Sequence, residues 1–321
     1  MRKSKSTFYK RVMPLSHGDV IDIVAPASAC SEKHLELAVQ WLEKQGYKAR
    51  YDKDILKPQK FLAQTDSYRF KKLKNALLDR KSKAVWCLRG GYGSFRLWPD
   101  LMKVKLPKSV QPKLLIGLSD ITSLHHFINQ EWKWPSLHAS LLDRIGQGKI
   151  DKHVETELMA SLQGSQEVFE YNNLTPLNKR ALSSKTINGV VRGGNLTTFV
   201  LSIGTELSLR KTQDKSIILF FEDIGERGYK VDRFLNHLKQ SGVLKSVSAL
   251  VFGDFTDCLE PNGQNLVPET LVDFACTLKI PVFTGLQSGH GDIQRPLFLN
   301  TPATLTCGKS GRMIVYSPYE T

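Results

Sequence analysis

The chain has 321 residues, 41% of them hydrophobic and 24% charged, which is typical of a globular protein and excludes global disorder. A chain of this length exceeds one ordinary core and predicts two domains. Five cysteines without a CxxC pair argue against a disulfide scaffold and a cysteine zinc site. The longest apolar runs, such as 217–221, have the length of strands, so we expect no membrane insertion. Residues 1–20 show no apolar core of a secretory signal, which predicts a cytoplasmic location.

The net charge of +14 lies entirely in the first third of the chain. Residues 1–120 hold 25 Lys and Arg against 11 Asp and Glu, whereas residues 121–321 hold 20 of each. A solvated lysine surface explains this excess, although the same charge can also gather an anionic substrate. The chain contains no helix-turn-helix, zinc-finger or RNP-like pattern, so no nucleic-acid partner is predicted.

Apolar and amphipathic segments alternate along the first 130 residues. Strands are predicted at 20–24, 47–51, 84–88 and 114–118, and helices at 35–42, 65–77 and 121–127. This order predicts an α/β fold with a parallel, flavodoxin-like or Rossmann-like sheet. Ligands of such sheets bind at the carboxyl ends of the strands, where the loops 89–94 and 119–120 lie.

The pattern changes after residue 167. Residues 167–185 are rich in polar residues and proline, and short strands then follow at 190–192, 217–221, 250–255, 281–285 and 313–316, with one clear helix at 231–239. We therefore assign residues 1–170 to an α/β domain, 171–188 to a linker and 189–321 to a β-rich C-terminal domain.

Ser119 directly follows an apolar strand and begins a helix. A serine at a sharp strand-to-helix turn projects its hydroxyl from the sheet, and the next backbone N–H points toward a developing oxyanion. An N-cap serine would show the same pattern without catalysis. The α/β-hydrolase elbow has glycine where this chain has Ile121, so the motif is not the one of that fold.

A serine nucleophile needs a base, and the chain has eight histidines. His290 differs from the others because it lies between two glycines in a loop after a strand, where the imidazole is reachable. His125, His126 and His138 are closer to Ser119 along the chain and remain alternatives.

A carboxylate must orient the base. Glu222 ends the strand 217–221 on the same face as Phe220, while Asp223 and Glu226 are rival acids. The glycines of the loop 89–93 permit close backbone approach to an anion, but the loop matches neither a dinucleotide fingerprint nor a Walker sequence. No metal-ligand spacing is present, so neither a metal nor a cofactor is predicted.

Five motifs, in this order, resemble the LD-carboxypeptidase family of serine peptidases, which also includes the microcin C immunity proteins. They are Cys87-Leu88-Arg89-Gly90-Gly91-Tyr92-Gly93, Gly117-Leu118-Ser119-Asp120-Ile121-Thr122, Arg192-Gly193-Gly194-Asn195-Leu196, Phe221-Glu222-Asp223-Ile224-Gly225-Glu226 and Gly289-His290-Gly291. The resemblance extends from about residue 20 to residue 316 and implies a parallel-sheet domain joined to a β-rich domain.

The resemblance also implies a Ser-Glu-His triad made of Ser119, Glu222 and His290. It places the oxyanion hole at the N–H groups of Gly91 and Asp120. The implied substrate is the anionic murein tetrapeptide, which the enzyme would cut after its diamino acid during peptidoglycan recycling. We further expect a homodimer.

One segment departs from the family pattern. The chain has His138-Ala139-Ser140 where members usually carry His-Gly-Pro, which leaves the substrate identity open. The alternatives are a detoxifying amidase of the microcin C type and an inactive muropeptide-binding protein.

Overall fold

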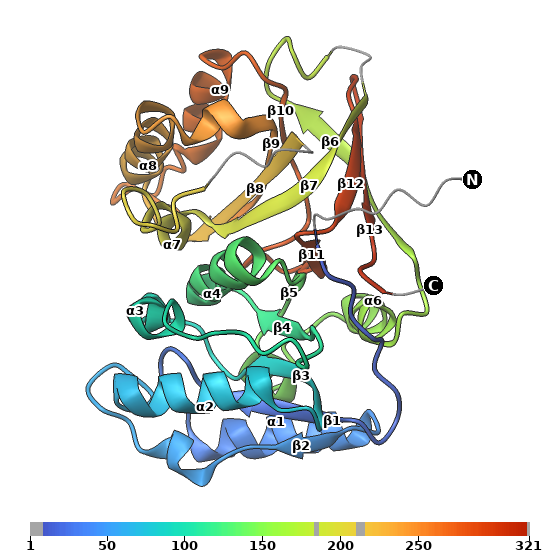
Figure 1. Ribbon diagram of the computed structural model, residues 1–321. Coiled ribbons are helices and arrows are strands. Elements are labelled where there is room, and N and C mark those ends of the chain that lie inside the picture. The colour runs from blue at the N-terminus through green and yellow to red at the C-terminus, as the bar shows by residue number, and fades with distance from the viewer. Residues whose placement is uncertain (1–8, 183–185, 210–215, 320–321) are drawn as a thin grey trace.

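The computed structural model describes residues 9–182, 186–209 and 216–319 (Figure 1). A six-stranded sheet in the order β11-β5-β4-β3-β1-β2 forms the centre of the N-terminal half. Its strands are β1 Val20–Val24, β2 Lys48–Arg50, β3 Ser82–Cys87, β4 Leu114–Gly117, β5 Ser136–His138 and β11 Leu297–Leu299. Strands β1 to β5 are parallel, as predicted, and β11 pairs antiparallel with β5.

Different helices cover the two faces of this sheet, because its side chains alternate in direction. The helices of this half are α1 Glu32–Lys44, α2 Asp66–Leu78, α3 Trp98–Leu101, α4 Thr122–Phe127, α5 Leu142–Gly146 and α6 Lys152–Gln163. Ile23 and Trp86 share a buried core with Leu35 of α1, whereas Val85 shares another with Leu73 of α2. The first face also joins the core of the C-terminal half, so the two halves are packed together.

A closed barrel in the order β10-β6-β13-β12-β7-β8-β9 forms the C-terminal half. Its strands are β6 Val168–Pro176, β7 Thr186–Asn195, β8 Ser216–Ile224, β9 Val247–Thr256, β10 Val282–Thr284, β12 Pro302–Thr306 and β13 Gly311–Tyr316. Three helices, α7 Leu196–Val200, α8 Gly228–Gln240 and α9 Val267–Cys276, lie together on one side of it (Figure 1). None of the helices in the described ranges is long and apolar enough to cross a membrane.

Two features correct the predicted domain boundaries. Much of the expected linker, residues 171–188, belongs to β6 and β7 of the barrel, while positions 183–185 lie outside the described residues. Strand β11 lies within the range assigned to the C-terminal domain, yet it pairs with β5 in the N-terminal sheet. The chain therefore returns to its first half after completing most of its second.

Candidate active site

Ser119 lies in a sharp turn at the carboxyl end of β4. Leu118 is extended, Ser119 has a φ of 65°, and a 3₁₀ turn, Ser119–Ile121, leads directly into α4. A non-glycine residue in the left-handed region stores about 1 kcal/mol or more of backbone strain. Strain of this kind at a strand-to-helix turn is the geometry that exposes a nucleophilic hydroxyl.

The glycine-rich loop after β3 lies directly against Ser119. A Cβ added to Gly90 would be 3.0 Å from the Ser119 Cβ and 3.3 Å from its Oγ, so a side chain at position 90 would press on this serine. Ser28 holds the loop on both sides of Gly91. Its N–H donates to the Gly90 carbonyl at 3.1 Å, and its Oγ accepts from the Tyr92 N–H at 3.1 Å. Position 91, with φ 95°, has no room for a Cβ beside Ser28.

The carboxylate of Asp120 joins the same loop to the serine turn. It is almost fully buried and accepts a hydrogen bond from the Ser94 N–H at 2.8 Å and another from the Gly93 N–H. Burial raises the pKa of Asp120, and these hydrogen bonds oppose that rise. On the other side of the loop, the buried Arg69 guanidinium donates to the Gly93 carbonyl at 2.9 Å. The sequence predicted a role for the Asp120 N–H but missed its carboxylate and Arg69.

Glu222 and His290 form a hydrogen-bonded pair. The His290 Nδ1 lies 2.6 Å from the Glu222 Oε2, and Glu222 is fully buried near the end of β8. A Cβ on Gly289 would be 2.8 Å from that oxygen, so only glycine lets the histidine loop approach this closely. Burial opposes protonation of the imidazole, but the charge and hydrogen bond of Glu222 outweigh it and raise the pKa of His290.

The rival acids have other partners. Asp223 accepts hydrogen bonds from the Asn195 side chain at 2.8 Å and the Thr197 N–H at 2.9 Å, at the start of α7. Glu226 lies 3.0 Å from the ammonium of Lys230 on α8.

Asp254, on β9, is an acid that the sequence analysis missed. Its carboxylate accepts a hydrogen bond from the Gly291 N–H, and its own N–H donates to the Ser288 carbonyl at 3.3 Å. Burial and then the charge of Glu222 raise the pKa of Asp254 to about 6. Asp254 thus contacts the loop on both sides of His290.

The rival histidines are buried and uncharged at neutral pH. Burial lowers the pKa of His125 and of His126 to about 4, and each ring contacts a backbone carbonyl, of Gly117 and Leu207 respectively. Burial also lowers the pKa of His138 well below its ordinary value. Its ring packs at 5.4 Å from the Phe220 ring.

Strand register brings the serine turn toward the Glu222–His290 pair. Gly117 of β4 pairs with His138 of β5, and His138 contacts Phe220, two residues before Glu222 on β8. In addition, the Thr122 hydroxyl accepts from the Asn195 N–H at 2.8 Å, and Asn195 pairs with Glu222 between β7 and β8. Within the described residues, no hydrogen bond joins the Ser119 hydroxyl to His290. In enzymes without substrate, the hydrogen bonds between catalytic groups are often long and tighten only when the substrate binds.

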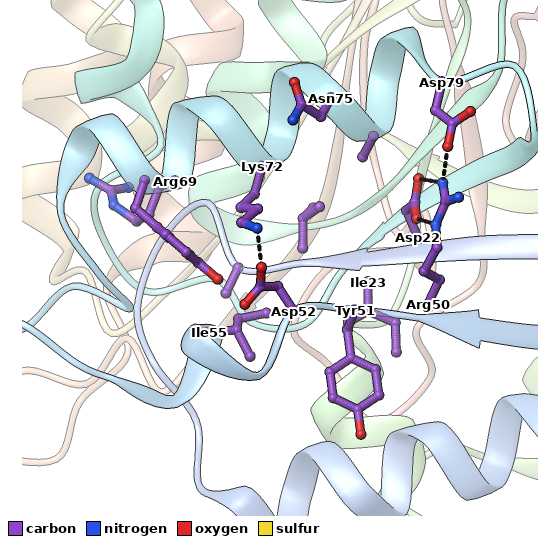
Figure 2. Close-up of a pocket in the computed structure, with 14 residues that line it drawn as sticks. Asp22, Ile23, Arg50, Tyr51, Asp52, Ile55, Arg69, Lys72, Asn75 and Asp79 are labelled. Atoms are coloured by element: carbon purple, nitrogen blue, oxygen red, sulfur yellow. Dashed lines mark hydrogen bonds and ion pairs between the residues drawn. The ribbon is translucent and has the colours of Figure 1, made fainter.

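A separate cavity of about 270 Å³ lies beneath α2, beside β1 and β2 (Figure 2). Its charged groups are paired: Arg50 donates to both Asp22 oxygens at 2.6 and 2.8 Å, and Lys72 contacts Asp52. Arg69 also lines the cavity, which places it between this space and the glycine-rich loop. Among the described residues, no cluster of His, Cys, Asp and Glu could hold a metal ion.

Comparison with known proteins identifies the class as a peptidase. Residues 21–139 match the model of the LD-carboxypeptidase N-terminal domain, and residues 188–305 match that of the C-terminal domain. The chain therefore belongs to the LD-carboxypeptidase family, as the five motifs predicted.

Individual relatives agree over most of their length. The chain is 30% identical to the murein tetrapeptide carboxypeptidase of Pseudomonas aeruginosa, over 84% of this chain and 88% of the relative. The solved muramoyltetrapeptide carboxypeptidase of Oxalobacter formigenes superposes with a TM-score of 0.79 at 28% identity, covering 94% of this chain and all of that one. The microcin C7 self-immunity protein of Escherichia coli is 25% identical, over 86% of this chain and 87% of its own.

Proposed function

We propose that the protein is a serine LD-carboxypeptidase that hydrolyses the amide bond to the terminal D-alanine of murein tetrapeptides, in peptidoglycan recycling. The observation that carries this proposal is the 2.6 Å hydrogen bond between His290 and the buried Glu222. Asn195, which pairs with Glu222, is hydrogen-bonded to Thr122, three residues after Ser119. The murein-cutting relatives support the substrate.

In this mechanism the His290 Nδ1–H donates to Glu222, which leaves Nε2 free to accept the Ser119 proton. The Ser119 Oγ attacks the carbonyl of the diamino acid, and the oxyanion accepts hydrogen bonds from the N–H groups of Gly91 and Asp120. The imidazolium then protonates the leaving amine of D-alanine, and the C–N bond breaks. Water hydrolyses the acyl-enzyme with His290 again acting as the base.

The order of the strands is consistent with a nucleophile from one half of the chain and an acid and a base from the other. We propose a flavodoxin-like assignment for the N-terminal sheet, because strands β2-β1-β3-β4-β5 follow one another in the doubly wound order. The nucleophile then lies at the carboxyl end of β4, while the acid and the base come from the barrel half. A homodimer in the cytoplasm completes the proposal.

The test is to incubate the protein with a purified murein tetrapeptide and to analyse the products by mass spectrometry. We expect the loss of one alanine. An acyl sulfamoyl adenosine, the kind of ligand bound in a solved microcin immunity protein of the same fold, serves as the competing substrate. Cleavage of that compound with an intact tetrapeptide would favour the detoxifying amidase instead.

A further inference from the structure

A carboxypeptidase must recognise the free carboxylate at the end of its substrate. That carboxylate is bonded to the same carbon as the leaving amine, so its binding group has to lie close to the histidine that protonates this amine. A protein supplies such a group as an arginine, because the planar guanidinium matches both carboxylate oxygens. Such an arginine would lie near His290 and would not already be paired with an acid.

Helix α5 lies between the two loops of the candidate site. On one side, the Asp143 N–H donates to the carbonyl of Leu88, which directly precedes the glycine-rich loop, at 3.0 Å. Just before the helix, the Ser140 hydroxyl donates to the side-chain oxygen of Gln294, in the loop that follows His290, at 2.7 Å. The short helix therefore borders the space that the substrate would occupy.

Arg144 projects from α5 on the side away from α1. Gly146 is in tight contact with α1, since a Cβ there would be 2.5 Å from the Ala38 nitrogen. Residues two positions apart point to opposite sides of a helix, so Arg144 leaves α5 on the other side. Burial and the charge of Glu222 dominate the pKa of His290, and the charge of Arg144 is among the influences that lower it, so this charge acts at the histidine.

Two polar atoms at Arg144 and its neighbour Asp143 lack hydrogen-bond partners within the described residues. They are the Nε of Arg144 and the Oδ1 of Asp143, and both are buried. Buried polar atoms of this kind require an explanation, such as a role in binding or catalysis. Asp143 already faces the guanidinium of Arg89 at 3.7 Å, so Arg89 and Arg144 share this one carboxylate. The cluster thus holds more positive than negative groups.

We propose that Arg144 binds the α-carboxylate of the leaving D-residue and so makes the site specific for the end of a peptide. This inference rests on the proposed carboxypeptidase function. Arg89 is the weaker candidate, because its side chain is 46% exposed and already has Asp143 as a partner. The contact would place the leaving residue beside His290 before the proton is transferred.

The experiment compares a murein tetrapeptide with its C-terminal carboxamide as substrates of the wild type, Arg144→Gln and Arg144→Lys. We expect Arg144→Gln to lower kcat/KM for the free acid about 100-fold, mainly through KM, because a charged hydrogen-bonded contact is lost. The carboxamide, which lacks the charge, should lose little. Arg144→Lys keeps the charge without the fork and should be intermediate, and it carries the test if the glutamine variant fails to fold.

Arg80→Gln is the matched control, because Arg80 is exposed just before β3, at the opposite end of the strands from Ser119. It should leave both substrates unaffected. Equal losses by Arg144→Gln on the acid and the carboxamide, or no loss on either, would overturn the role of Arg144 alone. A wild-type protein that cleaves neither substrate would instead contradict the proposed function and this inference with it.

Discussion

Ser119 has a strained backbone, with a φ of 65°, and also carries the proposed nucleophilic hydroxyl. Two substitutions distinguish the effect of the hydroxyl from the effect of the strain. Ser119→Ala removes the hydroxyl and keeps the strain, so we expect turnover to fall by ~10⁴-fold with little change in melting temperature. Ser119→Gly should be equally inactive yet more stable, by about 1 kcal/mol, because glycine accepts a positive φ. Kinetics and thermal melting of both variants check this. Activity within tenfold of the wild type in either one would exclude Ser119 as the nucleophile.

His290 works as a base only when it is neutral, and its pKa is raised. The acidic limb of kcat/KM should therefore fall at a pH above the ordinary histidine value of about 6.5. Glu222→Gln removes the charge that raises this pKa, so the limb should move to lower pH while the rate drops. The matched control is Glu226→Gln, which loses only the contact with Lys230. A pH profile that Glu222→Gln leaves in place would show that another group titrates.

The local sequence made Ser119, Glu222 and His290 candidates with rivals, and the resemblance to the family selected these three as the triad. The sequence did not indicate Asp254, Arg69 or Arg144. Asp254 and Arg69 contact segments distant in the chain, Gly291 and Gly93 respectively, and no local pattern marks such contacts. The proposed roles of the site residues stay predictions.

The Asp120 carboxylate holds the glycine-rich loop after β3 against the turn that begins α4. Asp120→Ala keeps the proposed oxyanion N–H but removes the acceptor of the Gly93 and Ser94 N–H groups. We expect kcat to fall about 100-fold and the free energy of unfolding to drop by about 1–3 kcal/mol. Asp120→Asn retains one acceptor oxygen and should lose less on both measures. An alanine variant with wild-type kcat would contradict an oxyanion hole built from this loop.

Strand β6 shows why the linker prediction was wrong. Phe169, Tyr171 and Leu174 are buried within it, but Asn172 and Asn173 interrupt the alternation, and Asn173 has a φ of 60° at an irregularity in the pairing with β13. A period-two reading of residues 168–171 alone would have indicated a strand. Strand β11 has only three residues, which is too short for any sequence pattern to show that it joins the first sheet.

For the molecule as a whole, the positive charge of residues 1–120 could attract an anionic substrate over a long range. If it gathers an anionic muropeptide, kcat/KM should fall as salt rises, because screening shortens to ~8 Å at physiological ionic strength. In contrast, kcat should stay nearly constant. Steady-state kinetics at low and moderate salt distinguish the outcomes, and a flat kcat/KM would indicate that the lysines only solvate the surface.

The halves of the molecule depend on each other for structure as well as for the proposed site. Strand β11 completes the first sheet, and one buried core includes residues of both halves. A fragment of residues 1–170 would lack this strand together with Glu222 and His290. The general α/β plan and five of the seven barrel strands, β7, β8, β9, β10 and β13, were predictable, whereas this return of the chain was not.

In the proposed mechanism, Ser119 and His290 act as one catalytic unit. The most direct measurement is kcat/KM on the murein tetrapeptide for Ser119→Ala, His290→Ala and the double variant. Residues that act together are strongly non-additive, so each single variant should lose ~10⁴-fold and the double variant no more than that. Losses that multiply in the double variant, or substantial activity left in either single variant, would contradict a joint role of Ser119 and His290.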